Sequence, residues 1–433
     1  MPPYPAPVVE FPMSGSWWFS RAPRRKVAGT LNQDADGRLA LETIGGLEEE
    51  PSSGAERIYG KCLEGSVTLV DAEWKGSRGA YSDARRDKPD SVTELWEATL
   101  GLVGRHVPER QTFAGVSIES YWTDGWADIP YWEQGRYSDG VLLRLAGERY
   151  AEIQRADFDG GSVDVSVGMT QQTGARTWSI ARHTRLNVRR NHPLSLASCL
   201  ADVGHLDALT NVLFGRPTSA ANINVTTTGG PGRQFGHQRA LIGTVAPPRF
   251  ASPGIRIHGQ TDSLCTFDQF GGIHGIAQWY ALREEFRYLA GRIGSHHRAS
   301  GRFLEDRALV AFSAGEALDR QETGYSQSNA RTRWKRLANA IPEFGGDYLN
   351  VPVDTWANAL VESRDDLSHA LTLGPRSLGT RGQLDGVTAS AHFLCMLTLF
   401  RLAGLGARVS PMVANQRWRD EKLAFAYLTN GFA

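Results

Sequence analysis

The stretch from Trp356 to Leu371 reads WANALVESRDDLSHAL and has the pattern of one amphipathic helix. Asp354 comes just before it, where its side chain can cap the first free N–H groups. The apolar residues recur at helical spacing and predict a buried stripe made of Trp356, Leu360, Leu367 and Leu371. The opposite face is polar and carries Arg364, Asp365, Ser368 and His369.

Arg364 and His369 stand at the two edges of this polar face. Five residues of helix turn through about 500°, so the two side chains point about 140° apart, with Asp365 and Ser368 between them. A permanent cation and a titratable imidazole are common on solvated helices, so the pair indicates a site only if the rest of the chain supports one.

The composition is that of a globular protein without a strong electrostatic field. A length of 433 residues predicts two or three domains. Lys+Arg and Asp+Glu number 47 each, so a nucleic-acid partner would need a local basic patch. The sequence has neither a signal-peptide pattern at its start nor a run of about 18 apolar residues, and we expect a cytoplasmic protein with no membrane partner.

The cysteines support the same expectation. They are widely separated, which disfavours a zinc cluster or a disulfide framework and indicates a reducing compartment. The four are Cys62, Cys199, Cys265 and Cys395.

Residues 11 to about 190 have the pattern of a β-rich region. Turn signals such as Asp36-Gly37 and Gly45-Gly46 separate short apolar runs, and this spacing predicts a sandwich or barrel-like module. We predict a loop over 77–90 and a short helix within 91–104. The predicted strands cover residues 17–19, 27–31, 39–45, 58–62, 67–70 and 115–122.

Many tryptophans lie in this β-rich region. They include Trp122, Trp126, Trp132 and Trp178. An aromatic-rich β module can be a platform for carbohydrates or nucleic-acid bases, but packing in the core and across strands explains the same residues, and we favour packing.

The second half changes to helical periodicity. We predict an α+β protein with a disordered N-terminus over 1–10, a β-rich domain over 11–245, a linker over 246–254 and an all-α bundle over 255–433. The β-rich domain includes a helix near 193–214 and a strand pair at 222–225 and 239–243. The bundle helices are predicted over 267–293, 303–321, 330–341 (a basic, amphipathic segment), 356–371, 387–405 and 416–428.

In such a bundle, Arg364 and His369 have the chemistry to cut RNA without a metal ion or another cofactor. His369 can take the proton of a ribose 2′-hydroxyl or give one to the leaving 5′-oxygen, and Arg364 can offset the charge on the phosphoryl oxygens. The 2′-oxygen then attacks the adjacent phosphorus, a route that DNA lacks. One pair supplies a single acid–base group, so a dimer that brings two such helices together would complete the site.

On these residues the chain resembles HEPN domains, because Arg364 to His369 fits their R-x4-H signature. Residues 276–286 and the segment with Glu316 are similar to earlier helices of the ApeA-type HEPN group. The first half resembles the ApeA N-terminal domain, and the resemblance extends from about residue 11 to 430. Its matching features are Gly15-Ser16-Trp17-Trp18, Gly29-Thr30-Leu31, Gly37, Leu39-Ala40-Leu41, Gly45, Ile58-Tyr59-Gly60 and Val67-Thr68-Leu69.

The resemblance implies a bacterial antiphage effector that acts by abortive infection. It implies a metal-independent endoribonuclease that is active as a homodimer through its HEPN domain. The substrate would be host or phage RNA, tRNA above all, and the N-terminal domain would respond to a phage-derived trigger. Arg364 and His369 would be catalytic, with Asp365, Ser368 and Glu316 in support.

One residue departs from the family pattern. Many active HEPN domains have asparagine after the arginine, whereas this chain has Asp365, whose carboxylate repels a phosphate. Asp365 would instead pair with Arg364 or orient His369, and Glu316 would contact Arg364 or be a surface acid. The departure leaves a second hypothesis open, in which the HEPN fold binds RNA or protein without cutting it.

Overall fold

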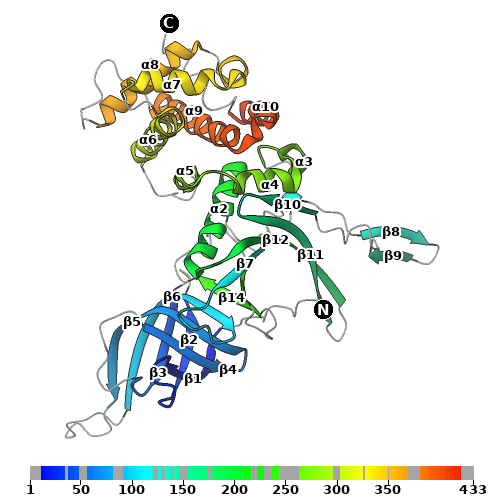
Figure 1. Ribbon diagram of the computed structural model, residues 1–433, viewed down its shortest axis with the longest axis vertical. Coiled ribbons are helices and arrows are strands. Elements are labelled where there is room, and N and C mark those ends of the chain that lie inside the picture. The colour runs from blue at the N-terminus through cyan, green and yellow to red at the C-terminus, as the bar shows by residue number, and fades with distance from the viewer. Residues whose placement is uncertain are drawn as a thin grey trace. The chain divides into compact units, whose positions relative to one another are not determined.

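The structure is a computed structural model that describes residues 11–34, 38–47, 56–80, 91–119, 125–127, 132–137, 140–145, 154–173, 178–215, 218, 222–228, 236–242, 263–295, 303–324, 327–349, 351–368 and 381–420. The chain forms two compact units (Figure 1). The first comprises residues 1–120, 187–203 and 219–256, and the second comprises residues 121–186, 204–218 and 257–433.

The described part of the first unit contains a closed antiparallel β-barrel. Strands β1 to β5 lie side by side in the order β3-β2-β1-β4-β5. Strand β6 pairs with both end strands, β3 and β5, and this closes the barrel. The strands are β1 (Met13–Phe19), β2 (Val27–Gln33), β3 (Leu39–Ile44), β4 (Glu56–Cys62), β5 (Gly65–Ala80) and β6 (Ser91–Gly104). The barrel-like N-terminal region predicted from the strand spacing is therefore confirmed.

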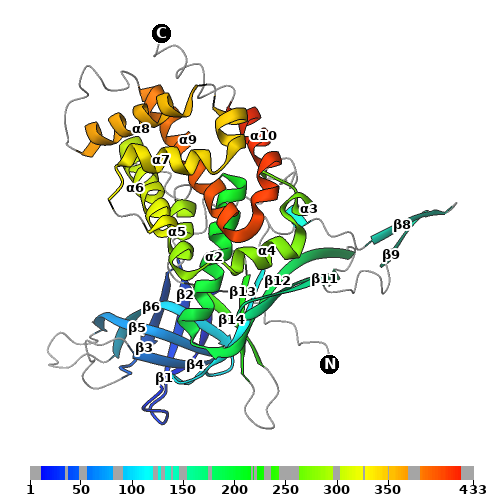
Figure 2. The same cartoon turned by 45° about the horizontal axis from the view of Figure 1, so that its top comes forward.

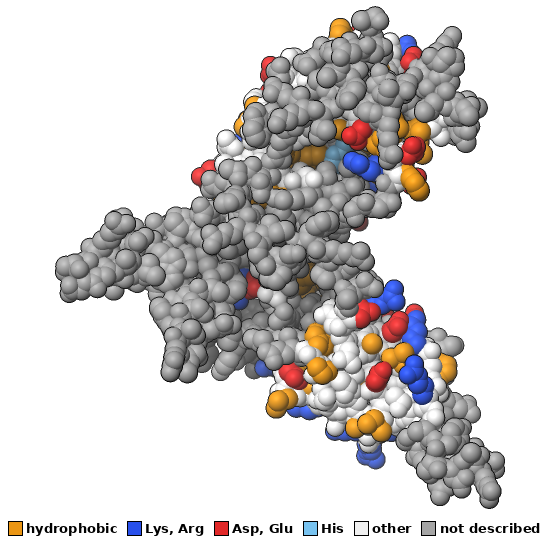
Figure 3. Space-filling view, turned by 180° about the vertical axis from the view of Figure 1, so that it is seen from behind, with side chains coloured by type: hydrophobic (Ala, Val, Ile, Leu, Met, Phe, Trp, Pro, Cys, Tyr) orange, Lys and Arg blue, Asp and Glu red, His pale blue; other side chains and the backbone are white. Residues whose placement is uncertain are grey.

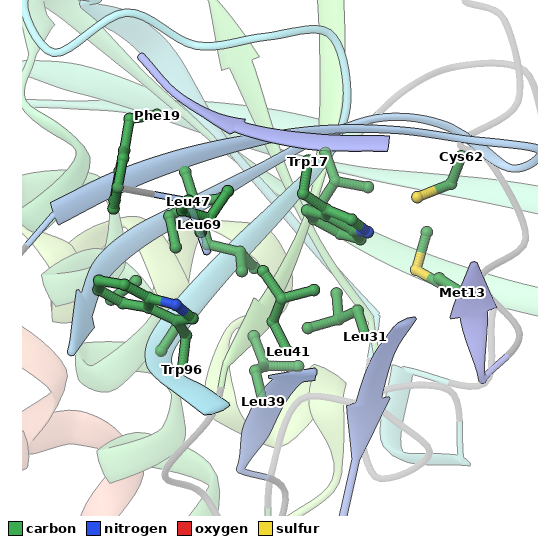
Figure 4. Close-up of a cluster of buried hydrophobic side chains, with 14 of the residues drawn as sticks. Met13, Trp17, Phe19, Leu31, Leu39, Leu41, Leu47, Cys62, Leu69 and Trp96 are labelled. Carbon is green, nitrogen blue, oxygen red and sulfur yellow. The ribbon is translucent and has the colours of Figure 1, made fainter. Parts of the chain in front are cut away.

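Two tryptophans fill much of the barrel interior (Figure 4). The ring of Trp17 lies against the backbone of Gly60 in β4, where an added Cβ would come within 2.3 Å of the ring. Its indole N–H donates to the carbonyl oxygen of Gly29 at 3.0 Å. Glycine at positions 29 and 60 therefore leaves the space that the Trp17 ring occupies. Trp96 packs edge-on against Phe19, with 5.3 Å between ring centroids.

The predicted helix within 91–104 is wrong, because the whole segment is strand β6. Its buried side chains alternate along the strand, at Glu94, Trp96, Ala98 and Leu100. Helix-forming Glu, Leu and Ala in this segment favour a helix locally, but pairing with β3 and β5 outweighs that preference. The predicted loop over 77–90 is also wrong at its start, since residues 77–80 belong to β5, and residues 81–90 lie outside the described residues.

Further strands extend the sheet of the first unit. β14 (Gly236–Ile242) pairs with the last part of β6, and β13 (Asn222–Thr227) lies between β14 and β7 (Phe113–Glu119). The predicted strands at 115–122, 222–225 and 239–243 are confirmed over their described residues. The predicted helix near 193–214 is α2 (Leu196–Phe214), which begins after the end of β12 (Trp178–Leu194).

The second unit is mainly helical in its described part, as predicted for the C-terminal half (Figure 1). Helix α6 contacts four other helices of this unit and forms its centre. The helices are α3 (Phe267–Phe270), α4 (Gly272–Tyr280), α5 (Glu284–Gly294), α6 (Leu304–Thr323), α7 (Ala330–Asn339), α8 (Val353–Ser368), α9 (Arg381–Phe400) and α10 (Val409–Asp420). Strands β8 (Trp132–Tyr137) and β9 (Gly140–Leu145) form a hairpin, and so do β10 (Gln154–Phe158) and β11 (Gly161–Thr173), which contact α4.

Several helix boundaries differ from the prediction, most clearly at the two ends of the bundle. The predicted helix over 267–293 is divided into three. Gly271 has a φ of 100° and ends α3 after one turn, and a second break separates the end of α4 at Tyr280 from the start of α5 at Glu284. The last described helix, α10, begins at Val409 instead of residue 416, and residues 421–433 lie outside the described part of the chain. The predicted disordered N-terminus over 1–10 and the linker over 246–254 lie outside it too, so the domain boundaries remain predictions.

One helical segment, Leu384–Gln416, is long and apolar enough to cross a membrane by length and composition alone. Its most apolar window is 61% buried within the protein, as in a core helix. Gly404 interrupts the segment with a φ of 81°. These features are those of a packed core helix followed by a kink.

Candidate functional site

Helix α8 is fixed in the second unit by its apolar stripe. Trp356 and Leu360 are fully buried, as predicted, and Leu367 is half-buried. The indole N–H of Trp356 donates to Ser390 Oγ in α9 at 2.9 Å, and its ring packs edge-on against Trp334 of α7. The orientation of α8, and therefore of its polar face, follows from this packing.

The start of α8 differs from the prediction. Asp354 lies within the first helical turn instead of capping it, and it forms an ion pair with Lys335 of α7. The carboxylate still lies at the positive end of the helix dipole, where a negative charge is favourable.

Arg364 projects from the polar face of α8 and makes two contacts with acids. Its Nε lies 2.8 Å from Oε1 of Glu316 in α6, and its Nη1 donates to Oδ1 of the neighbouring Asp365 at 2.9 Å. The Arg364 side chain is 36% exposed and that of Asp365 is 53% exposed. The sequence left two roles open for each of these acids. For both Glu316 and Asp365, the structure shows the predicted contact with Arg364.

Glu316 is a buried acid shared by two arginines. Its side chain is 8% exposed, and its second oxygen, Oε2, accepts a hydrogen bond from Nη1 of Arg333 in α7 at 3.1 Å. The contact of Oε1 with Arg364 is an ion pair without an aligned hydrogen bond, since Oε1 accepts none. Glu316 is therefore joined to α7 by a buried hydrogen bond and to Arg364 by a shorter ion pair at the half-exposed edge of the cluster.

A second ion pair joins the same two helices one turn further along. Asp319 of α6 is 1% exposed and accepts two hydrogen bonds from Arg336 of α7, at 2.7 and 2.6 Å. Ser328, before the start of α7, accepts from Arg336 at 2.9 Å and from Arg333 Nε at 3.4 Å. The two pairs cross-link α6 to α7, and in the described part of the chain the pair with Glu316 also contacts Arg364 of α8. Figure 2 shows α6, α7 and α8 together in the second unit.

The charges of Arg333, Glu316, Arg364 and Asp365 would allow an anion to bind at Arg364 and be released again. Arg333, Glu316 and Arg364 together carry one net positive charge, which Asp365 balances from the solvent side. A buried carboxylate between two guanidinium groups is costly to break, whereas the exposed contact of Arg364 with Asp365 contributes little. A phosphate that displaced Asp365 would therefore find a cation already held in place.

Two predicted site residues cannot be placed beside Arg364. His369 lies outside the described residues, and of Ser368 only the backbone, the last residue of α8, is described. The pairing of Arg364 with His369 remains a prediction.

Other histidines and tryptophans are mostly structural. His392 is buried in α9 and its Nε2 lies 3.0 Å from the carbonyl oxygen of Ile293, as expected for a packed histidine, whereas His274 is exposed on α4. In the β-rich part, Trp17, Trp96 and Trp126 are fully buried, which agrees with packing. Among the described residues, no group of three or more His, Cys, Asp or Glu side chains is placed to hold a metal ion.

Sequence reasoning missed Arg333. The basic, amphipathic pattern of α7 was a signal for surface arginines, but nothing in its spacing distinguishes the buried Arg333 from the exposed Arg331. Only the packing of α7 on α6 brings Arg333 to Glu316.

On the surface drawn in Figure 3, acidic and basic side chains are interspersed over the described face of the barrel. This mixture fits the equal numbers of acidic and basic residues in the sequence. That face therefore shows no broad region of one charge sign.

The family model of the ApeA N-terminal domain 1 matches residues 12–271. Neither the curated proteins nor the solved structures include a significant match. The matched region contains the closed barrel, including Trp17 with the glycines that it packs on. Because the match covers more than half of the chain, this protein belongs to the ApeA family of antiphage-defence proteins.

Proposed function

We propose that the protein is a metal-independent HEPN endoribonuclease that acts in antiphage defence from the cytoplasm. The observation that carries this proposal is Arg364, a half-exposed cation held by the buried Glu316 and followed five residues later in the sequence by His369. Membership in the ApeA family supplies the biological setting.

The proposed reaction uses the internal nucleophile of RNA. Arg364 contacts a phosphoryl oxygen after displacing Asp365, and it stabilises the charge that develops there. His369 removes the proton of the 2′-hydroxyl, the 2′-oxygen bonds to phosphorus, and the 5′-oxygen leaves with a proton. The products are a 2′,3′-cyclic phosphate and a 5′-hydroxyl.

The proposed active form is a homodimer. A single Arg364/His369 face supplies one acid–base group, and the reaction needs a base for the 2′-oxygen and an acid for the 5′-oxygen. A second copy of the helix supplies the other group. We propose tRNA as the principal substrate and a phage-derived trigger that acts through the β-rich N-terminal domain.

The test is RNA cleavage by purified full-length protein in the presence of EDTA. Labelled tRNA and total RNA are incubated with wild type, Arg364→Ala, His369→Ala and, as a matched control, Arg331→Ala, which removes an exposed arginine of α7. Wild type and the Arg331 variant should cut RNA to 2′,3′-cyclic phosphate ends, while the other two should not. The proposal fails if wild type prepared from cells in which it is toxic cuts no RNA, or if His369→Ala cuts equally well.

The alternative is an inactive HEPN fold that binds RNA or protein. The contact of Asp365 with Arg364 favours this alternative, because the carboxylate accepts a hydrogen bond from the guanidinium group that a phosphate would otherwise contact. In that case Arg364→Ala weakens binding of an RNA oligonucleotide, yet cells that express wild type accumulate no RNA fragments. Replacement of Asp365 by asparagine should then strengthen oligonucleotide binding without producing cleavage.

A further inference from the structure

We propose that Arg333 is a positioning residue that keeps Arg364 available for an anion by holding the other oxygen of Glu316. This inference rests on the proposed function for its RNA readout, and on the contacts of the described residues for its geometry. Arg333 lies on α7, outside the R-x4-H segment.

The two oxygens of the Glu316 carboxylate have unequal contacts. Oε2 accepts an aligned hydrogen bond from Arg333, whose side chain is only 9% exposed. Oε1 lies 2.8 Å from Arg364 Nε but accepts no aligned hydrogen bond. Because Arg333 is buried, its ion pair with Glu316 is little screened by solvent, whereas the shorter contact of the half-exposed Arg364 is screened more strongly.

The consequence follows from charge balance. Removing Arg333 would leave the buried Glu316 with Arg364 as its remaining arginine, and a buried carboxylate without full compensation is unfavourable. Arg364 would then move into a full, aligned ion pair with Glu316, and its charge would be cancelled at the surface. Arg333 thus limits the neutralisation of Arg364 by Glu316.

The same two helices provide a matched control. Asp319 and Arg336 form a buried pair between α6 and α7, as Glu316 and Arg333 do, but neither contacts Arg364 in the described structure. A loss of α6–α7 cross-linking affects both pairs alike. An effect on Arg364 is expected only from the pair with Glu316.

The experiment compares four full-length proteins: wild type, Arg333→Met, Arg333→Met with Glu316→Gln, and the control Arg336→Met with Asp319→Asn. The double variants contain no unpaired buried charge, so they test the proposal even if the single variant is unstable. Thermal unfolding followed by circular dichroism establishes that each protein is folded before it is used.

The first readout is the rate at which phenylglyoxal modifies Arg364, measured by mass spectrometry of the peptide. In Arg333→Met this rate should fall roughly three- to tenfold, because the ion pair with Glu316 shields the guanidinium group. Removing the carboxylate in the Glu316→Gln double variant should return the rate to within about twofold of wild type, and the control should stay within about twofold as well.

The second readout is tRNA cleavage. It should fall about tenfold in Arg333→Met and rise again in part in the double variant, because Arg364 regains its charge there but loses the Glu316 contact that holds it. A purely structural role for Arg333 predicts that cleavage follows the thermal stability of the four proteins and not the modification rate of Arg364. If Arg364 is modified at the same rate in all four proteins, the positioning role is wrong, whatever happens to RNA. If the modification rates follow the expected order but wild type cuts no RNA, the positioning role stands and the nuclease proposal fails.

Discussion

Replacing Gly315 by alanine tests the packing that places Glu316. A Cβ at Gly315 would lie 2.1 Å from one ring carbon of Trp334 and 2.5 and 2.8 Å from two others. Ordinary contacts are longer than 3.4 Å, and Trp334 is fully buried against Trp356, so its ring cannot move aside into solvent. Helix α7 would have to move away from α6, and Glu316, the next residue, would move with this interface.

The expected loss is the clash minus the gain from a better helix former. Overpacking a core costs about 1–3 kcal/mol, and contacts with three ring atoms put this case near the top of that range. Alanine in a helix is more favourable than glycine by about 1 kcal/mol. The net loss is therefore about 2 kcal/mol, which lowers the Tm of a unit of this size by roughly 4–8 °C.

The matched control is Gly291→Ala in α5. Gly291 is exposed and its added Cβ would meet nothing within 4 Å, so this variant should gain up to about 1 kcal/mol in stability. Both variants are compared with wild type by thermal unfolding at the helical circular dichroism band. If Gly315→Ala unfolds at or above the temperature of Gly291→Ala, Trp334 does not lie over Gly315, and the route from α7 to Glu316 is not as described.

Three further predictions concern other buried groups. Burial lowers the pKa of His392 from 6.5 to about 4, so between these pH values the unfolded chain binds a proton that the folded chain does not. Acidification through this window should therefore lower the free energy of unfolding by about 3 kcal/mol. Urea unfolding of His392→Gln should show a flatter pH dependence than that of wild type. All four cysteines are free and buried, and burial raises the pKa of the Cys199 and Cys265 thiols to about 12. A thiol reagent at pH 8 should therefore react with the native protein far more slowly than with the unfolded chain. In the barrel, Gly60→Ala should destabilise the first unit by about 1–3 kcal/mol, because the added methyl group meets the Trp17 ring; an unchanged near-ultraviolet circular dichroism melting curve would contradict this packing.

Local patterns were sufficient for most of the elements. The strands from β1 to β4 were predictable because turn residues separate short apolar runs, and the helices from α6 to α9 because their apolar residues repeat at helical spacing. The segment of β6 was not predictable, since its Glu, Leu and Ala residues favour a helix and only its two neighbouring strands make it extended. Hydrogen bonds between distant strands leave no mark on the local sequence.

The candidate site also has a part that the local sequence predicts and a part that depends on packing. Arg364, Asp365 and His369 were recognisable because they lie within six consecutive residues of the sequence, and their family signature is local. The sequence by itself determined the two structural classes, the polar face of α8 and the resemblance to the ApeA family. Only the tertiary structure decided that Glu316 is buried, and that Arg333 holds its second oxygen from a buried position while Arg364 contacts the first from a half-exposed one. The physical reason is that the strength of an ion pair depends on burial and on the partners that compete for it, and both come from how α6, α7 and α8 pack.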